Sequence, residues 1–157
     1  MKSLRRLALV AFTLVASTAG LAAKPVAGPK GGKILTTEAP HAEFFVEKDR
    51  KVTVTFYDKG LKPLPSATQV VSAIAEAKGG KVTLAFDPSD TRFVSKTALP
   101  PGDGYTVVVQ IRETAGARPK NYRVLFHDET CGECKRAEYA CVCDDAGGEH
   151  KHEEKKK

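Results

Sequence analysis

The two stretches that decide the fold class are KVTVTF at residues 51–56 and KVTLAF at residues 81–86. In both, apolar side chains occupy every second position and polar or small ones lie between them. This period of two is typical of a β-strand with one buried and one solvent-exposed face. Further stretches of this kind lie at 42–46, 105–111 and 122–126. Residues 92–96 predict another short strand, at the edge of a sheet.

Turn-forming clusters separate these stretches at intervals typical of an all-β sandwich. They are rich in Asp, Gly and Pro and lie at 58–60, 78–80, 87–90 and 100–104. The polar residues 47–50 predict a hairpin between the strands on either side. We therefore predict that residues 34–126 fold as an immunoglobulin-like antiparallel β-sandwich of seven to eight strands, because about 95 residues suffice for an independent two-sheet core.

Residues 66–77, SATQVVSAIAEA, fit two structures. Their first residues match a capping box, and Gly79 and Gly80 would end a helix. The same residues could form a strand that brings Val71 and Ala73 to one face. The strand is favoured, since a helix here would leave a seven-strand sandwich one strand short.

The amino terminus has the three parts of a secretory signal peptide. Three basic residues lie among the first six, an apolar run follows at 7–16, and small residues fill 17–23. The apolar run is about half as long as the ~20 residues that a membrane-spanning helix needs. We therefore predict that residues 1–23 are a removed signal peptide, that no membrane span remains, and that the protein is periplasmic or secreted.

The charge and length exclude several classes of protein. The chain has 157 residues, enough for one domain, and a net charge of +6. Lys2, Arg5 and Arg6 lie in the predicted signal, which leaves 22 basic against 19 acidic residues. This balance, without a basic patch interleaved with aromatic residues, does not indicate nucleic-acid binding. The chain also lacks a G-x-S-x-G nucleophile motif or another catalytic cluster, so we do not expect an enzyme.

All four cysteines lie within 13 residues and have the spacing C-x2-C-x6-C-x-C: Cys131, Cys134, Cys141 and Cys143. In a C-x2-C turn both sulfurs can face one point, and in an extended C-x-C both side chains lie on the same side. The intervening KRAEYA, 135–140, favours a helical turn that would fold the two pairs together. Four converging thiolates suit Zn²⁺ or a softer ion such as Cu(I). Residues 127–143 are therefore predicted to form a Cys-rich, metal-binding knob.

A second interpretation of the cysteines stays open, because disulfides persist in an oxidising compartment. Two disulfides could join the halves of the knob, either Cys131–Cys141 with Cys134–Cys143 or Cys131–Cys143 with Cys134–Cys141. The protein would then be an interaction module without metal. Such bonds would constrain little of the unfolded chain, since they close only short loops. The spacing fits both alternatives.

The segments that flank the body and the knob contain the remaining candidate ligands. Residues 24–33, KPVAGPKGGK, predict a flexible entry segment. Residues 144–157 are charged and poor in apolar side chains, which predicts a disordered tail. His150 and His152 in this tail could bind a metal loosely. His127 is close enough in sequence to the first cysteine to replace one thiolate as a ligand.

Several short segments of the body together carry a family resemblance: 28–32 (GPKGG), 42–46 (AEFFV), 52–58, 62–63, 99–100 and 104–105. Across residues 28–126 the chain resembles small exported immunoglobulin-like modules found beside heavy-metal efflux systems, including segments that precede the periplasmic adaptor subunits of such pumps. The resemblance implies a periplasmic location, a connection with metal homeostasis, and an efflux-system or other periplasmic protein as partner. It implies no catalytic residues.

Overall fold

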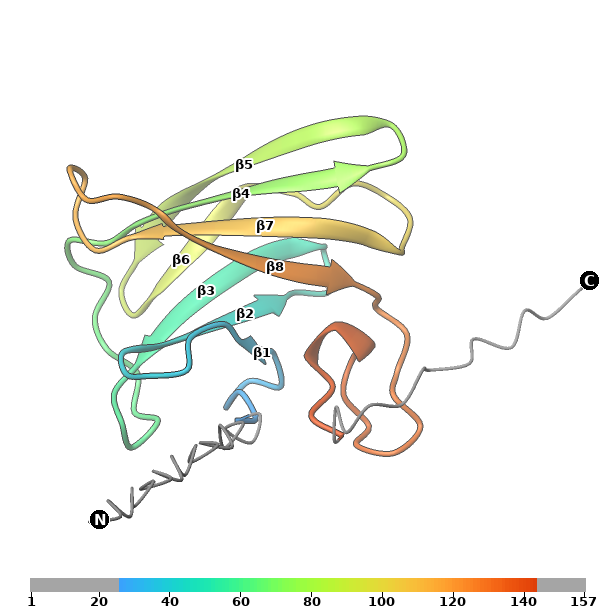
Figure 1. Cartoon of the computed structure of the whole chain (residues 1–157), viewed down its shortest axis with the longest axis horizontal. Coiled ribbons are helices and arrows are strands. Elements are labelled where there is room, and N and C mark those ends of the chain that lie inside the picture. Colours follow the sequence, from blue (N-terminus) through green and yellow to red (C-terminus); the bar gives the residue numbers. More distant parts are fainter. Residues whose placement is uncertain (1–25, 144–157) are drawn as a thin grey trace, which may run out of the picture.

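The computed structural model describes residues 26–143, which form eight strands and one short 3-10 helix (Figure 1). In chain order these are β1 (Lys33–Ile34), β2 (His41–Val46), β3 (Lys51–Tyr57), β4 (Val70–Ala77), β5 (Gly80–Ser89), β6 (Arg92–Ala98), β7 (Tyr105–Arg112), β8 (Lys120–Phe126) and the 3-10 helix η1 (Glu138–Ala140). Every strand pairing is antiparallel, which confirms the predicted all-β class. Within this range no helix is long and apolar enough to cross a membrane.

The eight strands form one sheet in the order β1-β2-β3-β6-β5-β4-β7-β8. The long strand β5 pairs with β4 through residues 80–85 and with β6 through residues 86–89, so the hydrogen-bond ladder continues from one half of the sheet to the other. The sheet curls into a half-barrel around a single core (Figure 1). An immunoglobulin-like sandwich of two separate sheets is therefore not confirmed, because β5 changes partner along its length and joins the two halves.

The structure decides two local questions that the sequence raised. Residues 70–77 form β4, and its inward residues Val71, Ala73 and Ala75 are buried, which confirms the strand over the helix. The strand predicted at a sheet edge is wrong in its position: β6 lies in the interior, between β3 and β5. The hairpin predicted at 47–50 joins β2 to β3.

Alternating side chains of the strands fill the core. Val52, Val54 and Phe56 of β3 are buried, as the alternation at 51–56 predicts, but the solvent-exposed face predicted for this strand is wrong, because Thr53 and Thr55 are buried as well. In β5 only some of the alternating apolar side chains are buried: Leu84 is inaccessible to solvent, whereas Val82 remains 37% exposed. Val82 lies in the part of β5 that pairs with β4 alone, beyond the point where β6 begins its pairing.

Glu43 of β2 is a fully buried carboxylate. Its Oε1 accepts hydrogen bonds from the backbone N–H groups of Lys30, at 3.0 Å, and Gly32, at 2.8 Å. The hydroxyl of Tyr57 donates to its Oε2 at 2.6 Å, and burial together with this bond raises the pKa of Tyr57. A Cβ atom at Gly28 would overlap the Glu43 carboxylate. The 28–32 turn, in the predicted entry segment, is thus tied to β2 and β3.

Candidate metal centre

The knob, residues 127–143, follows β8 and begins with a tight turn around the first two cysteines (Figure 1). The backbone N–H of Cys131 donates to the carbonyl of Arg136 at 2.7 Å, and the N–H of Lys135 donates back to the carbonyl of Cys131 at 3.1 Å. Lys135 has a φ of 59°, in the left-handed region, which reverses the chain directly after Cys134. The reversal lets the second cysteine pair return towards the first.

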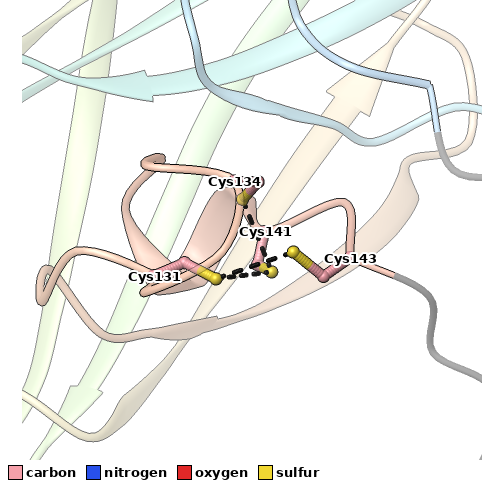
Figure 2. A group of neighbouring side chains, drawn as sticks. All are labelled: Cys131, Cys134, Cys141 and Cys143. Carbon is pink, nitrogen blue, oxygen red and sulfur yellow. Dashed lines mark hydrogen bonds between the residues drawn. The ribbon is translucent and has the colours of Figure 1, made fainter.

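The sulfur atoms of the four cysteines converge, and all lie within 4.8 Å of one another (Figure 2). Cys141 Sγ is 3.4 Å from Cys131 Sγ, and both the Cys131–Cys143 and the Cys134–Cys141 sulfur separations are 3.7 Å. A tetrahedron with metal–sulfur distances of about 2.3 Å has sulfur–sulfur edges of about 3.8 Å. A disulfide needs about 2.05 Å. These three separations are therefore close to the edge of a tetrahedral ligand set, and no pair lies at disulfide distance.

Hydrogen bonds and burial shift the pKa values of three of the four thiols. Hydrogen bonds from the backbone N–H groups of Val142 and, to a smaller extent, Arg136 lower the pKa of Cys134 to about 6. Burial acts in the opposite direction but does not outweigh them. Burial raises the pKa of Cys141, and the hydrogen bond with Cys141 raises that of Cys143. Hydrogen bonds of this kind also orient thiolates towards a metal. In the metal-free, reduced protein these hydrogen bonds favour the thiolate form of Cys134 at neutral pH.

We expect Cys134 to be alkylated first when the reduced, metal-free protein meets limiting iodoacetamide at pH 7, since the thiolate is the nucleophile. Its rate should fall as the pH drops through about 6, where the thiolate is protonated. At pH 7 the rates of Cys141 and Cys143, whose pKa values are raised, should be lower. Peptide mass mapping after short exposure measures this order, and equal labelling of all three cysteines at pH 7 would contradict it.

The cluster is partly open to solvent, and two cationic residues follow its second cysteine in the sequence. Cys131 is buried, whereas the other three cysteines are half-buried. Four thiolates around one Zn²⁺ carry a net charge of −2, and the chain places Lys135 and Arg136 directly after Cys134. Arg136 also donates from Nη1 to the carbonyl of Gly28 at 3.2 Å. Arg136 thereby ties the knob to the 28–32 turn, whereas Lys135 donates from Nζ to the carbonyl of Gly132 at 2.6 Å.

Arg50 holds the base of the knob. It forms an ion pair with Asp128 at 3.0 Å and donates from Nη2 to the carbonyls of Pro100, at 2.7 Å, and Gly102, at 2.8 Å. Its guanidinium lies 5.2 Å from the centre of the Phe126 ring, within the range of a cation–π contact. The first residues of the knob are thereby fixed to two loops of the half-barrel.

Tyr139 of η1 anchors the middle of the knob in the core, with only 5% of its surface exposed. Its ring centre lies 5.6 Å from those of Phe44 and Phe126, and its hydroxyl accepts a hydrogen bond from the Val46 N–H at 3.0 Å. The helical turn predicted for residues 135–140 is reduced to the three-residue η1, because Tyr139 and Ala140 pack into the core. This anchor escaped the sequence analysis, although Tyr139 is the only aromatic residue between the cysteines.

Of the three histidines proposed as additional ligands, only His127 lies within the described residues, and it is not part of the sulfur cluster. His127 Nδ1 lies 2.9 Å from Asp103 Oδ2, and its imidazole is not among the ligand atoms that gather around the cysteines. Its carbonyl accepts from the Tyr139 N–H at 3.0 Å. His150 and His152 lie outside the described residues, as do the predicted signal peptide and tail.

Comparison of the chain with protein-family models, curated proteins and solved structures returned no significant match. The class of site is therefore defined by its geometry alone, as a cluster of four cysteines able to hold a metal ion. The similarity to modules of heavy-metal efflux systems stays a prediction.

Proposed function

We propose that this protein is an exported metal-binding module in which Cys131, Cys134, Cys141 and Cys143 together hold one ion. The observation that carries the proposal is the convergence of four sulfurs at tetrahedral rather than disulfide separations. All-sulfur tetrahedral sites suit Zn²⁺, which is our first candidate, and the softness of thiolates makes Cu(I) the second. The protein would bind or pass on this ion without catalysing a reaction.

The setting of this function is also a proposal. The amino-terminal pattern of a signal peptide and the resemblance to efflux-associated modules both support a periplasmic or secreted protein that takes part in heavy-metal homeostasis. The half-buried state of three cysteines supports exchange of the ion with a partner, since a partner's ligands can reach the cluster from solvent. An efflux-system or other periplasmic protein is the partner we propose.

The competing function, a non-metal interaction module with two disulfides, requires movement of the knob. Even the closest pair, Cys131 and Cys141, would have to approach from 3.4 Å to about 2.05 Å. The alternative therefore predicts a different state of the same residues, and metal binding can be tested against it directly.

Titration with Co²⁺ tests the proposal, because Zn²⁺ itself has no useful visible spectrum whereas tetrahedral cobalt thiolate absorbs strongly. The reduced protein should develop this absorption, saturate at one Co²⁺ per chain, and lose the colour when Zn²⁺ displaces it. The disulfide-bonded protein offers no thiolate ligands, so prior oxidation should prevent the colour. A weak spectrum of octahedral cobalt in the reduced protein would contradict a four-thiolate site.

A further inference from the structure

The two ends of the strand order face the knob. β1 and β8 end the sheet, so within the described residues the half-barrel has a seam between them (Figure 1). η1 contacts both of these strands. Tyr139 inserts between Phe44 of β2, next to β1, and Phe126 of β8. The aromatic ring of the knob thereby closes the seam that the strands leave open.

The segment that closes the seam is the loop between the two cysteine pairs. Tyr139 lies in the six residues 135–140, and the sulfurs of Cys134 and Cys141 at the ends of this loop are 3.7 Å apart. A metal bound to both would fix the ends of the loop, and a loop with fixed ends loses less conformational entropy when it docks. Metal binding and docking of Tyr139 must then favour each other.

The contacts of the loop indicate which part can move. Arg50 fixes the base of the knob through Asp128, independently of the cysteines. Beyond that base, Tyr139 is held by its two ring contacts, by its hydroxyl bond to Val46, and by its own N–H, which donates to His127. A release of the loop would therefore expose the aromatic residues of the seam and the Val46 N–H while the strands keep their pairing.

We propose that residues 135–140 form a metal-controlled latch, and this inference rests on the proposed function. With the ion bound, Tyr139 is docked and the seam is closed. Loss of the ion frees the loop, and the Phe44 and Phe126 rings become an apolar surface at the sheet edge. Metal occupancy at the knob is thereby converted into a change in the exposure of these two rings.

Amide hydrogen exchange, followed by NMR with and without one equivalent of Zn²⁺, tests the latch in the reduced protein. The Val46 N–H should exchange at least about 10-fold more slowly with Zn²⁺, since docking restores its bond to Tyr139. The amide of Ala73, in the interior strand β4, should be unaffected. Equal Val46 exchange rates in the metal-free and the 1:1 Zn²⁺ protein would overturn the latch and leave metal binding intact. Failure to bind Zn²⁺ at all would overturn both proposals.

Variants of Tyr139 test the reciprocal effect on affinity. Coupled sites typically change each other's affinity by roughly 5–150-fold, so Tyr139→Ala should weaken Zn²⁺ binding by at least about 5-fold in competition with a chromophoric chelator. Tyr139→Phe retains the ring and should abolish only the zinc-dependent slowing at Val46, which keeps the test decisive if the alanine variant fails to fold. The matched control Tyr122→Ala, on β8, should bind Zn²⁺ as the parent does. Unchanged affinity in a folded Tyr139→Ala variant would overturn the latch.

Discussion

Replacing Cys141 with Ser should lower the affinity for Zn²⁺ by more than about 100-fold, because it removes one of the four proposed ligands, whereas loss of outer hydrogen-bonding groups alone costs about 10–100-fold. The strands should remain paired, since the core is built mainly from residues of the half-barrel, with Tyr139 and Ala140 added by the knob, and Cys141 is not part of it. Competition with a chromophoric chelator measures the affinity, and far-ultraviolet circular dichroism measures the strand content. Ser substitutions of the other three cysteines should have the same effect.

The matched control for this substitution is Thr130→Ser, which changes an exposed residue next to Cys131 without touching a sulfur. Its Zn²⁺ affinity should equal that of the parent. If the Cys141→Ser protein keeps both a full equivalent of metal and the parental affinity, Cys141 is not a ligand and the four-cysteine site is refuted.

Replacing Glu43 with Ala should destabilise the fold by roughly 3 kcal/mol or more. The substitution leaves the backbone donors of Lys30 and Gly32 and the Tyr57 hydroxyl without their buried acceptor, and each unsatisfied group costs about 1–3 kcal/mol. It also opens a cavity beside the 28–32 turn. Urea unfolding of the parent and the variant measures the difference.

Glu113→Ala is the control for Glu43, because it removes the same side chain from an exposed position. Glu113 pairs with Lys120 at 2.9 Å, but both side chains are largely in solvent, so its loss should change the unfolding midpoint little. Equal midpoints for the two variants would show that the buried hydrogen bonds of Glu43 do not hold the turn.

The alternation of apolar and polar residues predicted where the strands lie in the sequence, but not which strands pair with one another. The alternation at 51–56 identified β3 and its apolar face correctly, because both depend on side chains close in sequence, but it did not reveal that Thr53 and Thr55 on the opposite face are also buried. The interior position of β6 and the change of partner within β5 depend on pairing between distant segments, which alternation does not encode. The joining of the two halves into one curled sheet is therefore not apparent from the alternation.

The sequence also did not predict which polar residues are buried. The alternation of 42–46 assigns Glu43 to the solvent-exposed face of its strand, yet Glu43 is fully buried. Its partners come from the 28–32 turn, which looks flexible because of its Gly and Pro content and becomes ordered around a carboxylate eleven or more residues away. A turn rich in backbone donors next to a strand Glu is the signal that could have suggested the contact.

The sequence predicted which cysteines cluster, but not the contacts that hold the knob against the half-barrel. The spacing of the four cysteines was enough to predict that their sulfurs converge, because C-x2-C and C-x-C pairs each bring two side chains together by local geometry. The hydrogen bonds of Val142 and Arg136 to Cys134, and the docking of Tyr139, require the folded chain. Helix propensity of residues 135–140 was overridden by this packing, which left only η1.

Mass measurement of the protein purified without added metal tests the central claim most directly. Native and denatured spectra should be recorded with and without thiol alkylation. The account predicts a native mass raised by one metal ion and four alkylatable thiols after denaturation. A native mass without metal, combined with a denatured mass four hydrogens below that of the reduced chain and no alkylation, would mean two disulfides and would contradict it.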